Sequence, residues 1–455
     1  MHDKLPAYRL REGETSLDRE GMRTVKICEA FQSKQATLGV IGLGYVGLPL
    51  AVEYGKAGFK VIGIDVDQHK VDQINAGISY IIDVPSEDVA ELVNAGLLTA
   101  TTESTALRDC QSVNICVPTP LGKTKDPDIS YIQSAVSAIA PNLHEGMLVV
   151  LESTTYPGTC EEVILPMLAE GGLEVGKDFY LAFSPERVDP GNPVYQTKNI
   201  PKVVGGMTPA CCKAAASLYE QVMDSVVLVS SARVAETVKL LENTFRSVNI
   251  ALVNEIALMC HSLDINVWEV IEAAATKPFG FMPFYPGPGL GGHCIPIDPF
   301  YLSWKAKQVG QEARFIELAG QVNGNMPRHV VGLVGDALND RSRAVKGSRI
   351  LIVGVAYKPN IDDVRESPAL DIMRMLQLKG ATIDWYDPHV PALSGMEGMA
   401  KVDAWNETAL GIYDAVVIIT PHKVVDHTML LELDAAIVDT RNALKGHTAD
   451  NLSRL

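Results

Sequence analysis

The feature that most constrains the fold of this chain is a glycine-rich turn between an apolar run and a helical stretch. The apolar run ends at Gly39-Val40-Ile41, and the turn that follows reads Gly42-Leu43-Gly44-Tyr45-Val46-Gly47. The helical stretch stops at Gly58, and a second apolar run then ends in Asp65. Strand, turn, helix and strand in this order form one βαβ unit, so the sequence predicts a parallel sheet with helices packed on its faces.

Each glycine of this turn has a physical role in binding a dinucleotide. Gly42 makes the tight turn, Gly44 lets a pyrophosphate approach the backbone, and Gly47 lets the helix and the strand pack closely. The N-terminus of the helix attracts the phosphate charge. Asp65 accepts hydrogen bonds from the ribose hydroxyls and repels a 2′-phosphate, which favours NAD over NADP. The alternative is that the glycines only make a turn, and Lys70 lies either near the adenosine ribose or on the solvated surface.

The rest of the chain predicts further domains, because 455 residues are more than one domain usually contains. Apolar runs at residues 112–117, 147–151 and 180–183 continue a doubly wound sheet. Neither Gly nor Pro interrupts the chain between Ser231 and Leu263, which predicts one long helix that joins two domains or packs against a second subunit. We therefore expect an α/β fold of two Rossmann-like doubly wound sheets joined by a central helical domain. The expected limits are a polar extension at 1–35, an NAD-binding domain at 36–229, a central helical and dimerisation domain at 230–338, and a second Rossmann-like domain at 339–455.

The last of these regions repeats the opening pattern incompletely. An apolar run at residues 349–353 leads into a turn, a helix and a second run that ends in Asp387. Gly354 keeps the first glycine of the turn, but Ala356 and Pro359 replace the second and third. We expect that this turn no longer admits a dinucleotide pyrophosphate in the same way, and that Lys358 supplies a positive charge instead.

Composition excludes several classes of function. The chain has 39 Lys and Arg against 55 Asp and Glu, and its formal net charge of -16 argues against non-specific binding to nucleic acid or to anionic membranes. Its 8 cysteines form no CxxC pair and no zinc pattern, so we expect no metal and mostly buried free thiols in a reducing compartment. The first 34 residues are charged throughout, with a possible short helix from Leu17 to Phe31, and do not read as a signal peptide. No apolar stretch is long enough to span a membrane, so we expect a cytoplasmic protein.

A second glycine-rich loop, at residues 286–299, carries a candidate nucleophile. Its four glycines are typical of a backbone-lined loop that wraps a ligand, and Cys294 follows them. Asp298 and Pro299 predict a helix start, with Asp298 at the N-cap and Pro299 at the first helical position. A cysteine near a helix N-terminus can have a lowered pKa, and its thiolate is the reactive form. The alternatives are a buried inert thiol at Cys294 and a plain cap at Asp298.

Other candidate side chains lie on the long helix and at strand ends. Lys239 and Asn243 are four residues apart and share one helix face, where they could hold an oxyanion or a substrate hydroxyl. The alternative is a solvated lysine paired with Glu236 or Glu242. Glu186 follows a predicted strand, where open α/β sheets bind ligands, and is either a general base or a surface carboxylate.

Taken together, these segments resemble the UDP-glucose/GDP-mannose dehydrogenase family, from about residue 37 to the end. The segments that carry the resemblance are the Gly42–Gly47 turn, Thr119, Ser153-Thr154, Glu186, the helix of Lys239 and Asn243, the loop Gly291-Gly292-His293-Cys294 with Asp298, and Lys358 with Arg365-Glu366-Ser367-Pro368. Residues 184–191 and 277–286 look most like bacterial UDP-N-acetylglucosamine 6-dehydrogenases of surface-polysaccharide synthesis. Close relatives use UDP-N-acetylmannosamine or UDP-glucose.

The resemblance implies that the 6-hydroxyl of a UDP-sugar is oxidised twice, with two NAD consumed, to give a uronate. Cys294 would hold the aldehyde as a thiohemiacetal and then form a thioester, which water cleaves. Lys239 and Asn243 would stabilise the negative charge on the substrate oxygen. Glu186 would act in proton transfer during hydrolysis of the thioester.

The resemblance also implies that the Rossmann-like domain at 339–455 binds the UDP-sugar, and it assigns the remaining site residues. As catalytic residues, Asp298 and Thr154 would orient the lysine and the water. The implied cofactor-binding residues are Gly42, Gly44, Tyr45, Val46, Gly47, Asp65, Lys70, Thr119, Ser153, Thr154 and Arg365. The implied substrate-binding residues are Glu186, Arg187, Lys239, Asn243, Tyr285, Gly289, Gly291, Lys358 and Arg441. Relatives commonly place an arginine from a partner subunit in the site, and we expect a homodimer or higher homo-oligomer, although no clear equivalent of that arginine stands out in this sequence.

Two alternatives remain open from the sequence. A β-hydroxyacid dehydrogenase of the 6-phosphogluconate type shares the Rossmann domain and a helix lysine, but performs one oxidation without a thiol. A nucleotide-sugar or dinucleotide sensor that has lost catalysis is the other alternative, and the intact Cys294, Lys239 and Glu186 count against it.

Overall fold

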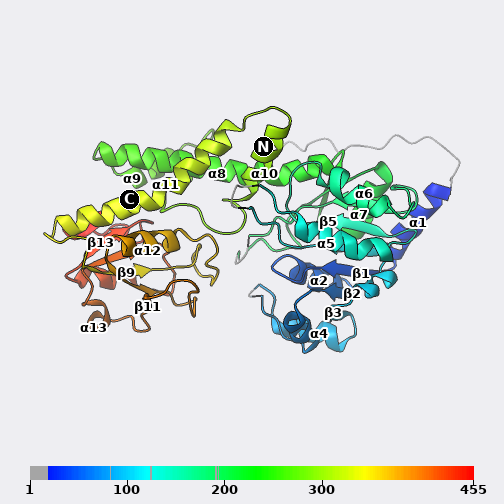
Figure 1. Cartoon of the computed structure of the whole chain (residues 1–455), viewed down its shortest axis with the longest axis horizontal. Helices are drawn as coiled ribbons and strands as arrows, with labels where there is room; N and C mark the ends of the chain where they lie inside the picture. Colours follow the sequence, from blue (N-terminus) through cyan, green and yellow to red (C-terminus); the bar gives the residue numbers. More distant parts are fainter. Residues whose placement is uncertain (1–18, 82, 123–125, 190–191, 193) are drawn as a thin grey trace. The chain divides into compact units, whose positions relative to one another are not determined.

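The computed structural model of the chain describes residues 19–81, 83–122, 126–189, 192 and 194–455 (Figure 1). Its internal contacts divide it into two compact units. Unit 1 contains residues up to Pro118 together with residues 130–153 and 158–236, and unit 2 contains residues 119–129, 154–157 and 237–455. The first 18 residues of the predicted polar extension lie outside the described part.

Unit 1 is built on an eight-stranded sheet with the order β3-β2-β1-β4-β5-β6-β7-β8. Strands β4, β5 and β6 are buried along their whole length, as expected for a sheet that helices cover on both faces. The strands are β1 Thr37–Ile41, β2 Lys60–Ile64, β3 Leu98–Thr101, β4 Ser112–Ile115, β5 Leu148–Leu151, β6 Tyr180–Phe183, β7 Lys202–Gly206 and β8 Val226–Leu228. The order runs outward in both directions from the neighbours β1 and β4, which is the switch point of a doubly wound sheet.

The expectation of a fully parallel sheet is wrong at one pair, because β7 runs antiparallel to β6. A parallel neighbour needs a crossover connection, which is usually a helix. No helix lies among the described residues between β6 and β7. The chain therefore turns back, and the start of β7 comes to the edge of the sheet where β6 ends.

The helices of unit 1 flank this sheet. Helix α1 occupies the place predicted for a short helix after Leu17, and Phe31 on it is fully buried in the core. The helices are α1 Arg19–Gln32, α2 Gly47–Lys56, α3 Gln68–Asn75, α4 Ser86–Asn94, α5 Ser130–Ile139, α6 Leu165–Ala169 and α7 Pro209–Tyr219, with short 3-10 helices η1 Ser104–Asp109 and η2 Ala140–Asn142 and a π-helical turn η3 Cys160–Ile164.

Unit 2 contains long helices and a second sheet. Helix α8, Ala232–Ser262, confirms the predicted long helix, and the division between the units falls inside it after Glu236. The other helices are α9 Val267–Ala275, α10 Asp298–Gln308, α11 Arg314–Asn339, α12 Pro368–Leu378, α13 Glu407–Leu410 and the 3-10 helix η4 His427–Glu432.

The second sheet has six parallel strands in the order β11-β10-β9-β12-β13-β14. Its strands are β9 Arg349–Val353, β10 Thr382–Tyr386, β11 Ala400–Lys401, β12 Ala415–Ile418, β13 Ala436–Asp439 and β14 Leu452–Arg454. Strand β9 lies between β10 and β12, just as β1 lies between β2 and β4. This matching order confirms the predicted fold class of two Rossmann-like sheets with a helical region between them in the sequence.

Among the described residues, no helix is both long and apolar enough to cross a membrane.

Candidate active site

The glycine turn after β1 has three glycines that are needed for three different reasons. Gly42 has a φ of +88°, and a Cβ on it would lie 2.6 Å from the carbonyl oxygen of Cys116. A Cβ on Gly47 would lie 1.8 Å from the carbonyl oxygen of Gly42. A Cβ on Gly44, by contrast, would have no described atom within 4 Å. The protein's own packing therefore explains Gly42 and Gly47, whereas the open space at Gly44 fits a ligand that approaches the backbone.

Asp65, at the end of β2, lies against the same turn. Its Oδ2 accepts a hydrogen bond from the backbone N–H of Leu43 at 2.8 Å, and its Oδ1 accepts one from Asp67 at 3.0 Å. Lys70 Nζ lies 3.4 Å from Oδ2, so this lysine pairs with Asp65. A carboxylate has about four acceptor positions, so Asp65 keeps acceptor capacity for ribose hydroxyls while it is held in place. The turn and Asp65 together fit the adenosine half of NAD.

The other predicted cofactor residues divide between the two units. In unit 1, Ser153 donates from Oγ to the carbonyl oxygen of Val117 at 2.7 Å, which fixes the turn after β5. Val46 precedes α2 at its N-cap position, and Tyr45 is half-exposed beside it. Thr119, Thr154 and Arg365 belong to unit 2. In that unit the carbonyl oxygen of Thr119 accepts a hydrogen bond from the Tyr301 hydroxyl.

Glu186 lies just beyond the end of β6 in unit 1, as predicted. Its Oε1 accepts hydrogen bonds from the backbone N–H groups of Arg187 and Val188, at 2.7 and 2.9 Å. Its Oε2 lies 3.2 Å from Lys202 Nζ. Burial alone would raise the pKa of Glu186, but the Lys202 ammonium and the two backbone donors lower it. Glu186 is therefore a fixed, ionised carboxylate rather than a solvated surface residue.

In unit 2 the residues predicted to carry the chemistry are close together. Asn243 donates from Nδ2 to Asp298 Oδ2 at 2.5 Å, and both side chains are buried. Lys239 is buried one helical turn before Asn243, and its charge acts on both Asp298 and Cys294. The side chain of Cys294 is exposed, unlike most of the other cysteines, which are buried. A thiol, an ammonium, an amide and a carboxylate thus form one cluster between α8 and the start of α10.

Two sequence expectations about this cluster are wrong. Helix α10 begins at Asp298 itself with Ile297 at the N-cap, and Asp298 bonds Asn243 instead of capping the helix. The pKa of Cys294 is raised to about 11 rather than lowered. Although the side chain reaches solvent, the burial of its surroundings and the Asp298 carboxylate raise this pKa more than Lys239, Arg365 and Arg246 lower it. Burial also raises the pKa of Asp298 to about 6.

The loop before Cys294 packs against the second sheet of unit 2. A Cβ on Gly287 would lie 2.3 Å from Nη1 of Arg441, and one on Gly291 would lie 2.6 Å from the Cβ of Tyr357. Gly289 has a φ of +135°, which favours glycine. Tyr285 stacks on Trp268 with ring centroids 6.2 Å apart. The loop that carries predicted substrate-binding residues therefore packs against Arg441, a predicted substrate-binding residue after β13, within one unit.

Arg441 and Arg365 have different surroundings. Arg441 is half-buried beside Gly287, and burial lowers its pKa to about 10. Arg365 is half-exposed and pairs with Asp363, at 2.6 Å from Nη2 to Oδ2. Lys358 lies in the turn after β9. The contacts predicted for Arg365 with the cofactor and for Lys358 with the substrate stay predictions.

The second sheet differs from the first at the position that matches Asp65. Asp387 follows β10 and is fully buried. Its Oδ2 accepts hydrogen bonds from the backbone N–H groups of Val355 and Ala356, at 2.8 and 3.1 Å, and contacts His422 Nε2 at 2.9 Å. Its Oδ1 accepts two more, from His389 and Val390. The chain itself therefore occupies the acceptor positions that a ribose would need.

Comparison with known proteins shows the family of the chain. Models of the UDP-glucose/GDP-mannose dehydrogenase family match three successive stretches: the NAD binding domain matches residues 36–223, the central domain 233–325 and the UDP binding domain 351–446. The chain belongs to this dehydrogenase family. It is therefore an NAD-dependent oxidoreductase with a UDP-binding domain, and the predicted family, activity class and cofactor are confirmed. This membership also decides against a β-hydroxyacid dehydrogenase and a catalytically inactive sensor.

The relatives of this dehydrogenase act on several amino sugars. A UDP-N-acetyl-D-glucosamine 6-dehydrogenase of Pseudomonas aeruginosa is 37% identical over 393 residues, which are 86% of this chain and 91% of the relative. An NDP-N-acetyl-D-galactosaminuronic acid dehydrogenase of Ralstonia nicotianae is 39% identical over 424 residues, which are 89% of this chain and 95% of the relative. The solved structure of a UDP-D-ManNAc dehydrogenase from Pyrococcus horikoshii is 34% identical, covers 92% of this chain and 98% of its own, and superposes with a TM-score of 0.84.

The dehydrogenase also contains charged groups that the sequence interpretation missed. Lys202, the first residue of β7, bridges Glu186 and Glu152. A lysine at the start of an apolar strand is buried with the strand and therefore needs a buried anion, which is the signal in the sequence. Arg246 lies seven residues after Lys239 on α8 and lowers the pKa of Cys294, and its helical spacing was the available signal.

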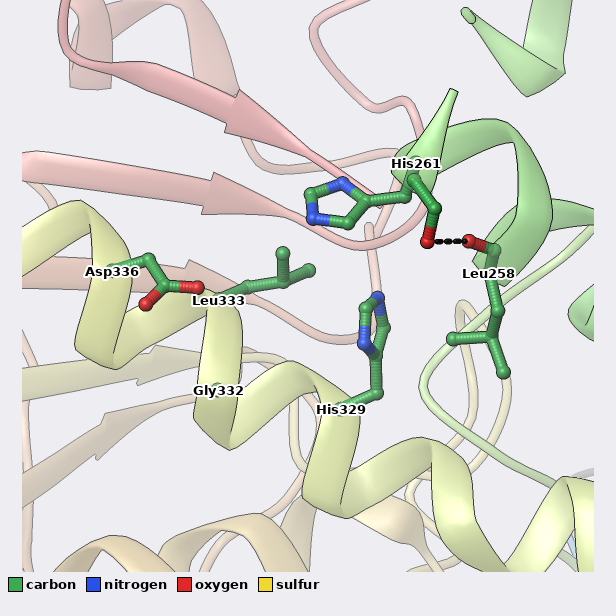
Figure 2. Close-up of a pocket in the computed structure, with 7 residues that line it drawn as sticks. Leu258, His261, His329, Gly332, Leu333 and Asp336 are labelled. Atoms are coloured by element: carbon green, nitrogen blue, oxygen red, sulfur yellow. Dashed lines mark hydrogen bonds between the residues drawn. The ribbon is translucent and has the colours of Figure 1, made fainter. Parts of the chain in front are cut away.

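A cavity of about 310 Å³ in unit 2 lies away from these residues, between α8 and α11 (Figure 2). The imidazole rings of His261 and His329 meet edge to face in it, with centroids 5.4 Å apart. Burial, and then the neighbouring His261, lower the pKa of His329, and Asp336 opposes this. None of the residues predicted to bind cofactor or substrate lines this cavity, so it is distinct from the cluster around Cys294.

Proposed function

We propose that this dehydrogenase oxidises the 6-hydroxymethyl group of a UDP-N-acetylhexosamine, most specifically UDP-N-acetylglucosamine, to the carboxylate of the uronate. The observation that carries the proposal is the cluster of Cys294, Lys239, Asn243 and Asp298 in unit 2. A single oxidation of an alcohol needs no thiol, whereas an oxidation that continues to the acid needs a group that holds the aldehyde.

The proposed reaction uses the cluster in sequence. Lys239 and Asn243 stabilise the negative charge on the substrate oxygen as the alcohol becomes an aldehyde. Cys294 Sγ then adds to the aldehyde carbon and gives a thiohemiacetal, whose oxidation leaves a thioester. Water cleaves the thioester and returns the thiol, with Glu186 taking part in the proton transfer and Thr154 orienting the water. NAD, when bound, accepts one hydride in each of the two oxidations.

The raised pKa of Cys294 fits this order of events. A thiol with a pKa of about 11 is almost wholly protonated at neutral pH, so the resting enzyme carries no reactive thiolate. Nucleophilic attack then requires a base for the Sγ proton. Asp298, with a pKa of about 6, is ionised at neutral pH, and its negative charge raises the pKa of the thiol, so it helps to keep Cys294 protonated until a base removes the Sγ proton.

The nucleotide half of the substrate is proposed to lie along the loop of residues 285–291 and Arg441. The open backbone of a glycine loop lets a diphosphate approach closely. The half-buried Arg441 offers donors to its charge, and the stacked Tyr285 offers an apolar face to the uracil ring. Gly289, Gly291, Lys358 and Arg187 complete the proposed substrate contacts.

A panel of UDP-sugars tests the proposal. UDP-N-acetylglucosamine, UDP-N-acetylmannosamine, UDP-N-acetylgalactosamine and UDP-glucose are each incubated with NAD, and NADH and uronate are measured per sugar. Two NADH per uronate with UDP-N-acetylglucosamine as the best substrate is the expected result, and Cys294→Ser should form no uronate. One NADH per sugar, or full uronate production by the serine variant, would refute the thioester route. Glu186→Gln should accumulate the thioester on Cys294, visible by intact mass spectrometry.

UDP-N-acetylmannosamine is the second candidate substrate. The superposition with the Pyrococcus horikoshii UDP-D-ManNAc dehydrogenase favours it, and the same panel decides between the two sugars by their kcat/KM.

We also propose that the enzyme acts in the cytoplasm, in surface-polysaccharide synthesis, as a homodimer or higher homo-oligomer. Helix α8 supports the assembly, because its side chains Phe245, Leu252 and Met259 are exposed in the single chain at a spacing of seven residues. Light scattering after gel filtration should give at least twice the 49.2 kDa of one chain. A monomer at micromolar concentration would contradict this assembly.

A further inference from the structure

A buried charge cluster lies at one edge of the unit 1 sheet, at the ends of neighbouring strands. Asn114 is on β4, Glu152 follows β5, and Glu186 follows β6. Lys202 reaches the same edge because β7 runs antiparallel to β6, with Phe183 paired to Gly205. Continuing this register outward places Lys202 beside Glu186. A parallel β7 would have put the lysine at the opposite edge of the sheet.

Lys202 is shared between two carboxylates. Its Nζ lies 2.6 Å from Glu152 Oε2 and 3.2 Å from Glu186 Oε2. Lys202 is 3% exposed and Glu152 is 1% exposed, so water does not screen this arrangement. Burying three charges is costly unless each is paired and hydrogen-bonded. Because burying these charges is costly, we looked for a functional role of the cluster.

The two carboxylates have different surroundings. Glu152 Oε1 accepts hydrogen bonds from Asn114 Nδ2, at 2.9 Å, and from the Tyr219 hydroxyl, and burial raises its pKa. Glu186 has two backbone donors in addition to Lys202, and its pKa is lowered. Both carboxylates hold Lys202 charged by raising its pKa against the effect of burial.

Three other titratable side chains face the cluster, and Arg187 lies next to Glu186 in the chain. Burial raises the pKa values of Tyr54, Tyr219 and Cys116 well above their usual range, so all three are neutral. Arg187 follows Glu186 in the chain and directs its Nη1 to the carbonyl oxygen of Pro201 at 2.8 Å. Among the described residues, Lys202 is thus the one ammonium in hydrogen-bond contact with Glu186.

We propose that Lys202 is a positioning residue that keeps Glu186 ionised and fixed at the end of β6, with Glu152 as the anchor that holds the lysine in place. The inference rests on the proposed function, in which Glu186 takes a proton during thioester hydrolysis. A protonated Glu186 cannot accept that proton, so the charge of Lys202 sets the pH range in which hydrolysis is fast.

The pH profile of kcat tests the proposal with two opposing variants. Lys202→Gln keeps a polar side chain but removes the ammonium, so the acidic limb should move up by one pH unit or more. At pH values below both limbs its kcat should fall about tenfold for each pH unit of this shift, and it should recover at about pH 9, with the Cys294 thioester accumulating at the lower pH. In Glu152→Gln the Lys202 ammonium has Glu186 as its one carboxylate partner in the cluster, so the acidic limb of the kcat profile should move to lower pH. Lys202→Arg should keep the wild-type limb, and KM for NAD and UDP-sugar should change little in all three.

A measurement without substrate separates this inference from the proposed function. The enzyme is labelled with ¹³C at the glutamate carboxyl carbons, and the Glu186 signal is assigned by its loss in Glu186→Gln. In the wild type this carboxylate should stay ionised at pH values where Lys202→Gln has protonated it. If the panel of UDP-sugars gives no uronate, the proposed function fails while this titration still decides the role of Lys202.

Two results would overturn the inference. One is an identical Glu186 titration in the wild type and in Lys202→Gln. The other is a loss of kcat in Lys202→Gln that is equal at all pH values, since a merely structural bridge acts in that way. If Lys202→Gln does not fold, the double variant with Glu152→Gln removes one charge of each sign and serves as the background. In that folded double variant the acidic limb of the kcat profile must still lie at higher pH than in the wild type. An acidic limb at the wild-type pH refutes the proposal.

Discussion

The clearest quantitative contrast in the molecule is between two glycines of the same turn. Ala at position 47 would place a Cβ 1.8 Å from the Gly42 carbonyl oxygen, and since real contacts do not fall below 3.0 Å, the turn must move by more than 1 Å. Such overpacking costs about 1–3 kcal/mol. A domain of this size loses roughly 2–4 °C in Tm per kcal/mol, so Gly47→Ala should melt about 2–12 °C lower.

Gly44→Ala is the matched control, because its Cβ meets no described atom within 4 Å and the residue does not have a positive φ. Folding should change by less than about 0.5 kcal/mol. The methyl group instead occupies the space proposed for the pyrophosphate, so the Kd for NAD should rise about tenfold or more, which corresponds to about 1.4 kcal/mol.

Thermal denaturation without NAD and calorimetric titration with NAD measure the two effects separately. Gly44→Ala should lose binding with a wild-type Tm, and Gly47→Ala should lose stability first. Wild-type NAD affinity in Gly44→Ala would refute the assignment of this turn to the pyrophosphate. A Tm of Gly44→Ala as low as that of Gly47→Ala would refute the packing argument.

Three further substitutions test other parts of the chain. Asp65→Ala should weaken NAD binding and relax the discrimination against NADP, because it removes the carboxylate that repels a 2′-phosphate; unchanged kinetics with both cofactors would remove Asp65 from the ribose site. Asp298→Asn should lower the pKa of Cys294 from about 11, because it removes a negative charge beside the thiol, and alkylation by iodoacetamide at about pH 8 should become about tenfold faster each time this pKa falls by one; an equal or slower rate contradicts this. His329→Asn should weaken the loss of stability on acidification. The pKa of His329 in the folded protein lies below the ordinary value of about 6.5, so the unfolded chain binds the proton first as the pH falls below that value, and this binding favours unfolding. Urea midpoints at about pH 7.5 and pH 5.5 measure this, and an unchanged difference between them would count against a buried neutral His329.

The sequence predicted those parts of the molecule that local rules determine. The turn at Gly42, the carboxylate at Asp65 and the long helix α8 each depend on residues within a few turns of one another. The cluster of Lys239, Asn243 and Cys294 was predicted from helical spacing and from resemblance, because each segment carries its own pattern.

What the sequence missed depends on pairings between distant segments. The antiparallel direction of β7 follows from a connection without a helix, and only that direction brings Lys202 to Glu186. The raised pKa of Cys294 depends on how much protein surrounds the thiol, which spacing does not contain. The position of Asp298 inside α10 reflects its bond to Asn243, 55 residues away in the chain, which outcompetes the local cap.

The filled acceptor positions of Asp387 have a consequence for how the enzyme tells its two nucleotides apart. His422 Nδ1 accepts a hydrogen bond from the backbone N–H of Asn360 at 3.0 Å, so a neutral ring carries its proton on Nε2, facing Asp387. Burial alone would raise the pKa of Asp387, but the His422 ring and the backbone donors lower it to about 2. In the second sheet, protein groups thus make the contacts with Asp387 that ribose hydroxyls would make in a nucleotide site. High NAD concentrations should therefore not inhibit the enzyme by competing with the sugar nucleotide.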